Sequence, residues 1–229
     1  MNVQGFQKMT LLDFPGKVAC TVFTGGCNLR CPFCHNAGLV LTPTESENLY
    51  SEVLEFLEKR KGLLDGVCIT GGEPLLQPDI AEFIKSVKDM GYLVKLDTNG
   101  CYPERLKELV EGGLVDYVAV DIKNSKEKYP LTVGIDGFDL SNIEKSVEFL
   151  IKSDADYEFR TTVVAQLHTE DDIKKIAEWI KGAKRYFLQN FVDSGNLIGQ
   201  NLSATSRETL RKMKETALCT ISSVEIRGI

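Results

Sequence analysis

Short apolar runs alternate with longer amphipathic segments along this 229-residue chain, and the alternation restricts the folds that it can adopt. A strand followed by a helix that leads back to a neighbouring strand builds a parallel sheet covered by helices, and near-continuous apolar strands suit such a sheet. We therefore predict an α/β fold with parallel strands and outer helices. The six repeats favour a partial (β/α)6 barrel, with a doubly wound sheet left open as the alternative. The predicted strands are 18–24, 67–70, 93–97, 117–122, 157–164, 186–190 and a final one at 219–226, and the predicted helices are 45–61, 78–90, 103–111, 141–152, 169–181 and 204–218.

Composition limits the classes of protein that the chain can represent. It is 43% hydrophobic and 26% charged, as expected of a soluble globular protein, and no apolar run approaches the length of a membrane span. The net charge of −6 and the lack of a block rich in Lys and Arg disfavour nonspecific nucleic-acid binding. The N-terminus has no basic-then-apolar signal pattern, so we expect a cytoplasmic protein. Without a long linker or an internal repeat, residues 1–229 are expected to form a single domain.

Polar and glycine-rich motifs follow four consecutive predicted strands. A cysteine-rich loop follows the first strand, and the motifs TGGEP at 70–74, DTNG at 97–100 and DIK at 121–123 stand at the ends of the next three. In parallel βα architectures, ligands bind at the carboxyl ends of the strands. We therefore expect the four motifs to converge on one rim and to form the functional site.

Cys27, Cys31 and Cys34 have the spacing C-x3-C-x2-C on the first of these loops. Three thiolates can bind three irons of a [4Fe–4S] cluster and leave the fourth iron open for a ligand that is not protein. An open iron provides a place for chemistry, whereas a cluster with four protein ligands mostly carries electrons. The loop is therefore a candidate catalytic site.

Two other interpretations of the cysteines are less favoured. A disulfide framework is typical of small, cysteine-dense secreted chains with an even count, whereas seven cysteines are spread over this chain. A structural zinc site needs a fourth ligand, commonly from a second paired knuckle, and none is present; His35 directly follows Cys34, and adjacent residues rarely bind one tetrahedral ion together. The remaining cysteines are interpreted as buried small hydrophobic residues: Cys20, Cys68, Cys101 and Cys219.

Taken together, the cysteine loop, the GGEP turn and the strand-end motifs resemble those of radical S-adenosylmethionine (SAM) enzymes. The segment DFPG at 13–16, the loop through His35 and Asn36, and the motifs at 97–100 and 121–123 are similar to the glycyl-radical activases. Among these, they look most like the activating proteins of anaerobic ribonucleoside-triphosphate reductase. No second cysteine cluster is present, so the chain resembles the minimal activases, without ferredoxin-like insertions.

The resemblance implies a partial (β/α)6 barrel, a [4Fe–4S] cluster and SAM. SAM would bind the open iron through its amino and carboxylate groups, and one electron would break its S–C5′ bond to give methionine and a 5′-deoxyadenosyl radical. As an oxidoreductase of the activase type, the protein would use this radical to remove a Cα hydrogen from a glycine of a partner enzyme. A radical SAM enzyme that acts on a small molecule or modifies a peptide is the alternative, and a noncatalytic iron–sulfur protein is a rival of another class.

The resemblance also assigns residues. Cys27, Cys31 and Cys34 would bind the cluster, Glu73 the SAM amino group and Lys123 the SAM carboxylate. Asp97 and Asp121 are expected to contact SAM or, alternatively, to hold a cation, since hard cations prefer carboxylate oxygens. Phe33 could equally pack the loop, and Arg160 could pair with Glu158 or another acid. The full set expected to bind the cofactor is Phe33, Cys34, His35, Gly71, Gly72, Glu73, Asp97, Asn99, Asp121, Lys123 and Arg160.

The expected partners are a glycyl-radical enzyme and a low-potential electron donor such as flavodoxin or ferredoxin. Both donors are acidic, so an acidic chain would need a local basic face near the cluster, with Lys8, Lys17 or Arg30 as candidates. Some activases carry a histidine after the sixth strand that meets the cofactor, but the segment 188–191 here reads LQNF. His168 lies earlier and is interpreted as a loop or cap residue.

Overall fold

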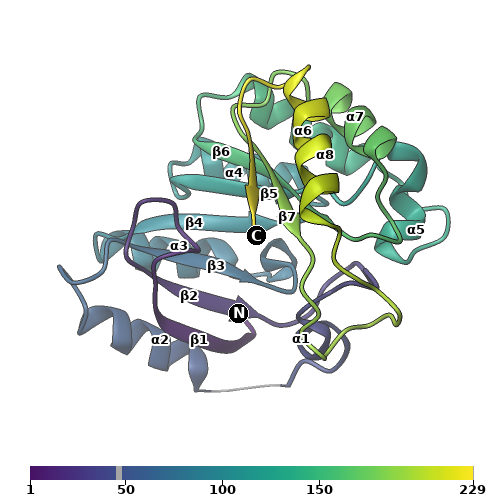
Figure 1. Cartoon of the computed structure of the whole chain (residues 1–229). Coiled ribbons are helices and arrows are strands. Elements are labelled where there is room, and N and C mark those ends of the chain that lie inside the picture. Colours follow the sequence, from purple (N-terminus) through teal and green to yellow (C-terminus); the bar gives the residue numbers. More distant parts are fainter. Residues whose placement is uncertain (45–47, 229) are drawn as a thin grey trace. The chain divides into compact units, whose positions relative to one another are not determined.

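The computed structural model describes residues 1–44 and 48–228, and its contacts divide the chain into two compact units (Figure 1). The first contains Met1–Asn28 and Gly38–Ala119, and the second contains Leu29–Ala37 and the chain from Val120 onward. Residues 45–47, at the start of the predicted helix 45–61, lie outside the described residues. The expectation of a single domain stays a prediction.

The strands of the first unit are β1 (Val3–Thr10), β2 (Ala19–Thr24), β3 (Gly66–Gly71), β4 (Leu93–Thr98) and the start of β5 (Tyr117–Asp121). The strand pairs β2–β3 and β3–β4 are parallel, whereas β1 pairs with β2 in the antiparallel sense. Val67, Cys68 and Ile69 in β3 have no exposed surface, as expected for a strand covered on both faces. The antiparallel β1 was not predicted, because its sequence, VQGFQKMT, lacks a clear apolar alternation.

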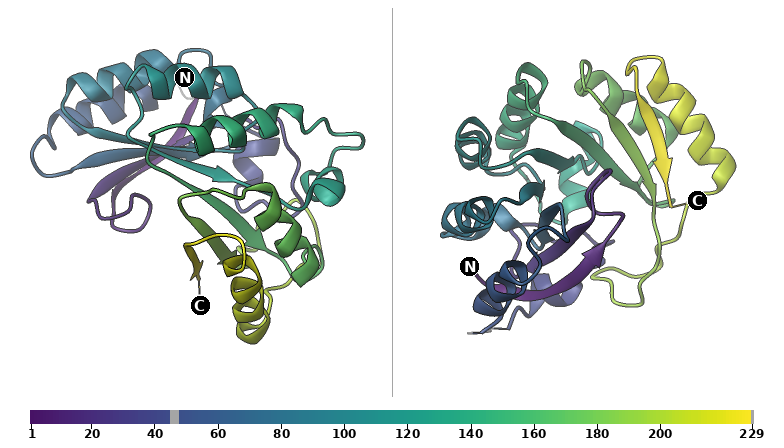
Figure 2. Two further views of the ribbon diagram at one scale, coloured as in Figure 1. Left: turned by 90° about the horizontal axis from the view of Figure 1, so that it is seen from above. Right: turned by 90° about the vertical axis from the view of Figure 1, so that its left-hand side faces the viewer.

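The helical elements of this unit are α1 (Ala37–Leu41), α2 (Leu49–Glu58), η1 (Pro74–Leu76), α3 (Ile80–Asp89) and α4 (Pro103–Glu111). The buried residues of α3 are Ile80, Phe83, Ile84 and Val87, which is the spacing of one helix face. Figure 2 shows α2, α3 and α4, in blue to teal, along one face of the unit's strands. The helices thus cover one face of the strands, and the turns at the strand ends are left to carry the side chains of a site.

The second unit continues the same alternation. It contains the end of β5, η2 (Lys126–Lys128), α5 (Tyr129–Val133), α6 (Ser141–Lys152), β6 (Tyr157–Val163), α7 (Glu170–Trp179), β7 (Tyr186–Asn190), α8 (Arg207–Leu218) and β8 (Val224–Arg227). The pairs β6–β7 and β7–β8 are parallel. In Figure 2, α7 and α8 lie along one face of these strands. Strand–helix units thus run in order from β2 to α8, which confirms the predicted α/β fold with parallel strands and outer helices.

No helix among the described residues is long and apolar enough to cross a membrane.

An ion pair joins the two strands that flank β7, namely β6 and β8. Glu158 on β6 has no exposed surface, and its two carboxylate oxygens accept hydrogen bonds of 2.7 and 2.8 Å from the guanidinium of Arg227 on β8. The guanidinium carbon also lies 3.5 Å from the ring centroid of Phe187 on β7. One side chain of β8 thus contacts residues of two other strands.

Replacing Arg227 by Ala should lower the free energy of unfolding by about 2–3 kcal/mol, because a buried carboxylate loses its paired cation. Urea denaturation measures this change. Arg211, an exposed residue of α8, gives the matched control, and Arg211→Ala should stay within about 0.5 kcal/mol of the wild type. A loss below about 1 kcal/mol for Arg227→Ala would show that the pair contributes little.

Candidate functional site

In the first unit, the turn after β3 lies directly against the backbone that precedes Cys27. The Gly72 N–H donates to Thr24 O at 2.8 Å, and the Glu73 N–H donates to Gly26 O at 2.8 Å. A Cβ on Gly72 would lie 1.9 Å from Gly26 O, which is too close for two atoms that are not bonded to each other. Gly72 is therefore required by this close approach of two backbones, since only glycine lacks a Cβ.

Glu73 connects this turn to the motif at the end of β4. Its carboxylate is fully buried and accepts hydrogen bonds from Leu75 N–H at 3.0 Å, Thr98 Oγ1 at 2.7 Å and Asn99 N–H at 2.7 Å. The first of these caps the short helix η1. The predicted residues of the GGEP turn and the DTNG motif are thus held together by one carboxylate.

Asn99 extends the connection to the cysteine loop. Its side-chain amide lies 3.8 Å from Cys27 Sγ and donates to Asn28 Oδ1 at 2.8 Å. An amide donor beside a cysteine sulfur is a means of tuning an iron–sulfur cluster. The structure therefore brings Asn99, Glu73 and Gly72 together with Cys27, and the convergence of all four strand-end motifs stays a prediction.

Lys95 was missed in the sequence analysis. It is buried in β4 with 2% of its surface exposed, and its ammonium contacts Asp97 and lies 3.8 Å from Cys68 Sγ. A charged side chain in the middle of the apolar run 93–96 is the signal that could have identified it. A buried lysine is almost always paired, and here its partner is a predicted site residue.

In the second unit, Asp121 and Lys123 form a charged group with Arg160. Asp121 accepts from Lys123 Nζ at 3.1 Å and from Arg160 Nε at 2.9 Å. Burial disfavours the charged carboxylate, but Arg160 and Lys123 outweigh it and hold the pKa of Asp121 well below its usual range. Arg160 thus pairs with Asp121, whereas Glu158, the acid named as its alternative partner, pairs with Arg227.

Lys123 also faces the cysteine loop. Its ammonium lies 5.9 Å from the ring centroid of Phe33, which is buried. Burial acts to lower the pKa of Lys123, but Asp121 and then Cys31 raise it above its ordinary value. His35 stacks on Phe191 at 5.6 Å between centroids, and burial followed by the charge of Lys123 lowers its pKa. Lys123 is therefore a stable cation beside the loop that carries Cys31 and Cys34.

The cysteines have the chemistry that an iron–sulfur cluster requires. All of Cys27, Cys31 and Cys34 are free of disulfides, and thiolates are the protein ligands of such clusters. Cys27 belongs to the first unit and the other two to the second. Among residues 1–44 and 48–228, no three His, Cys, Asp or Glu side chains form a group that could hold a metal ion. The donor set fits a cluster, and the ligation of one cluster by all three cysteines stays a prediction.

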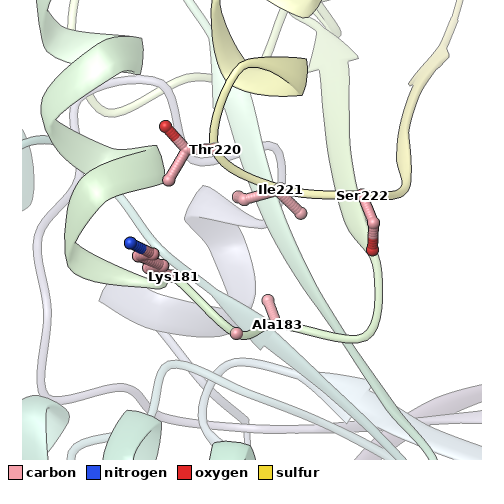
Figure 3. Close-up of a pocket in the computed structure, with 6 residues that line it drawn as sticks. Lys181, Ala183, Thr220, Ile221 and Ser222 are labelled. Atoms are coloured by element: carbon pink, nitrogen blue, oxygen red, sulfur yellow. The ribbon is translucent and has the colours of Figure 1, made fainter.

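A pocket of about 580 Å³ lies elsewhere in the second unit (Figure 3). It is lined by residues of the segments that precede β7 and β8: Lys181, Gly182, Ala183, Thr220, Ile221 and Ser222. These segments lead into the amino ends of the strands, whereas Asp121 lies at the carboxyl end of β5. The pocket therefore contains none of the predicted site residues.

Comparison with known proteins gives consistent matches. Residues 21–180, more than half of the chain, match the family model described as the radical SAM superfamily. A protein of Methanocaldococcus jannaschii, named provisionally as a glycyl-radical enzyme activating enzyme, is 34% identical over 236 residues, which cover 99% of this chain and 96% of that protein. The pyruvate formate-lyase-activating enzyme of Clostridium pasteurianum is 29% identical over 190 residues, which cover 80% of this chain and 77% of that enzyme.

Among solved structures, Streptococcus suis SuiB bound to S-adenosylmethionine superposes with a TM-score of 0.71 at 14% identity. The match covers 90% of this chain and 49% of SuiB, so this chain spans about half the length of that protein. At this identity the similarity establishes a common fold.

Replacing Gly72 by Ala should displace the backbone before Cys27 and reduce iron binding, because the added Cβ would collide with Gly26 O. We expect less than half of the wild-type iron content after anaerobic reconstitution, with a loss of stability of about 2–3 kcal/mol. Iron analysis and urea denaturation measure the two effects.

Gly5→Ala is the matched control for this substitution, since a Cβ at Gly5 would meet nothing within 4 Å. It should leave both quantities near their wild-type values. If Gly72→Ala bound iron as fully as Gly5→Ala, the close approach would not be what places Cys27.

Proposed function

Because the chain belongs to the radical SAM superfamily, whose cofactors are a [4Fe–4S] cluster and SAM, we propose that it is an activase that generates a glycyl radical on a partner enzyme. The observation that carries this proposal is the similarity over nearly the whole chain to the M. jannaschii protein named as a glycyl-radical enzyme activating enzyme. We further propose anaerobic ribonucleoside-triphosphate reductase as the partner, on the basis of the motif set and the single cysteine cluster.

Cys27, Cys31 and Cys34 would hold the cluster as thiolates, and SAM bound there supplies the 5′-deoxyadenosyl radical. In this proposal the protein's own residues bind and orient SAM. Phe33, on the loop between two of these ligands, would offer an aromatic surface near the cofactor. Gly71 and Gly72 would allow its close approach to the backbone, since neither carries a Cβ.

Charged side chains among the predicted site residues suit the two ends of the methionine part of SAM. Lys123 and Arg160 outnumber Asp121, so this group of three carries one positive charge in excess, which favours the SAM carboxylate. The buried carboxylate of Glu73 offers the opposite charge, which favours the SAM ammonium. Each assignment follows from opposite charge and stays a proposal.

Lys95 also bears on the alternative role of Asp97. A metal cation at Asp97 would have to compete with an ammonium that the chain itself supplies. We therefore favour a contact of Asp97 with SAM, such as a hydrogen bond to a ribose hydroxyl, over a cation site.

The electron needed for SAM cleavage would come from flavodoxin or ferredoxin. Among the basic candidates for docking, Lys8 and Arg30 are exposed, and Lys17 is partly exposed. Free thiols and an oxygen-sensitive cluster suit the reducing cytoplasm, which we propose as the location.

The proposal is tested by mixing the anaerobically reconstituted, reduced protein with SAM and the candidate reductase. Electron paramagnetic resonance should show a glycyl doublet on the reductase, and the variant Cys34→Ser should give none. SAM cleavage without a doublet would reject this partner and favour a small-molecule or peptide substrate. An absence of SAM cleavage under reducing conditions would contradict the enzymatic function.

Replacing Lys123 by Met should raise the KM for SAM at least about tenfold, because a hydrogen bond to a charged group contributes roughly 1.5–3 kcal/mol. Lys152→Met is the control, since Lys152 lies on α6 with 72% of its side chain exposed. Steady-state formation of 5′-deoxyadenosine measures both variants. Equal KM values for the two would remove Lys123 from the SAM site.

A further inference from the structure

Buried side chains hold both polar backbone atoms of Lys123. The Lys123 N–H donates to the hydroxyl of Tyr129 at 3.2 Å, and the Lys123 carbonyl lies 2.8 Å from Nε2 of His168. Tyr129 has no exposed surface, and His168 has 4%. Lys123 lies just beyond the end of β5, where a backbone would otherwise depend on water for its hydrogen bonds.

The hydrogen bonds of His168 determine which nitrogen carries its proton. The Val164 N–H donates to Nδ1 at 3.1 Å, so Nδ1 is the unprotonated nitrogen of a neutral ring. Nε2 then carries the proton and donates to the Lys123 carbonyl. Burial lowers the pKa of His168, which favours this neutral ring. Both nitrogens therefore have defined and different roles.

The two loops that meet at His168 are fixed by further contacts. Asn124 donates to Leu167 O at 3.1 Å, and Ser125 donates to the carboxylate of Asp172 at 3.1 Å. Thr169 and Asp172 form a capping box that starts α7 directly after His168. The imidazole is thus held from both sides and cannot easily follow a displaced Lys123.

Tyr129 is fixed in a similar way by aromatic packing. Its ring centroid lies 5.9 Å from that of Phe138 and 6.0 Å from that of Trp179. The ring position depends on these contacts, whereas the hydroxyl serves the backbone of Lys123. The phenol and the imidazole therefore constrain the two peptide groups on either side of the Lys123 Cα.

We propose that His168 and Tyr129 are positioning residues that fix the Lys123 backbone so that its ammonium points toward Asp121 and the cysteine loop, ready for the SAM carboxylate. The inference rests on the proposed role of Lys123 in binding SAM. It gives His168 a function in the site, although the sequence suggested only a loop or cap residue.

Two substitutions of His168 separate its contact with the Lys123 carbonyl from its contact with the Val164 N–H within its own loop. The side-chain amide of Gln reaches the position of Nε2, so His168→Gln retains a donor for the Lys123 carbonyl. The amide of Asn reaches only the position of Nδ1, so His168→Asn retains the acceptor for the Val164 N–H and loses the bond to Lys123. Calorimetry on the anaerobically reconstituted proteins measures the Kd for SAM, and thermal melting monitors the fold.

We expect His168→Asn to raise the Kd for SAM about tenfold and His168→Gln to stay within about threefold of the wild type. A larger rise in the Kd for His168→Gln than for His168→Asn, or an equal rise in both, would overturn the proposal. The role of the ring would then be to accept the hydrogen bond from the Val164 N–H and so to hold its own loop. Wild-type protein that fails to bind SAM would contradict the proposed function itself, before any comparison of variants.

Tyr129→Phe provides an independent variant that keeps the packed ring and removes only the hydroxyl. It should raise the Kd for SAM about fivefold while its melting temperature stays within a few degrees of the wild type. If Tyr129→Phe bound SAM as tightly as the wild type, the two-sided restraint of Lys123 would be refuted even where a His168 variant failed to fold.

Discussion

The close approach of two backbones at Gly72 and Gly26 is the constraint on which the arrangement around Cys27 depends. No side chain fits between them, and the Glu73 N–H continues the contact with a hydrogen bond to Gly26 O. The Glu73 carboxylate then holds the end of β4, which places Asn99 beside Cys27. Cys27, proposed as a cluster ligand, is thus positioned by backbone contacts and hydrogen bonds.

The second unit relies on charge in the corresponding role. Asp121 lies between Lys123 and Arg160, and these two cations hold its pKa well below its usual range despite burial. Lys123 is in turn held through its backbone, which leaves its ammonium beside Phe33 and near Cys31. A cation placed in this way can attract an anionic ligand group without first being reorganised, which is the advantage of preorganised charge.

The sequence predicted the larger features because each has a local signal. The parallel strands are apolar and β-branched, and the motifs TGGEP, DTNG and DIK stand at the strand ends, where ligands bind in such sheets. Glu73 was expected to bind the SAM amino group, and the structure adds that its carboxylate already accepts three hydrogen bonds from the protein. The strand β1 was missed because its sequence lacks a clear apolar alternation.

Other residues depend on contacts between distant segments, which no periodicity reveals. His168 meets Lys123 across 45 positions of the chain, and Asp172 meets Ser125 across 47. Lys95 is a local exception: it stands out within an apolar strand, and its partner Asp97 lies two residues on, on the same face of β4. Tertiary hydrogen bonds and ion pairs therefore account for most of what the sequence left unassigned.

The most direct measurement of the central claim follows a single hydrogen atom. The partner enzyme is prepared with glycine deuterated at Cα and is incubated anaerobically with the reduced protein and unlabelled SAM, and 5′-deoxyadenosine is then analysed by mass spectrometry. Transfer of one deuterium into 5′-deoxyadenosine is predicted, because in the proposed function the radical removes the Cα hydrogen of a glycine. Production of 5′-deoxyadenosine without deuterium, in the presence of a partner that becomes activated, would contradict the account.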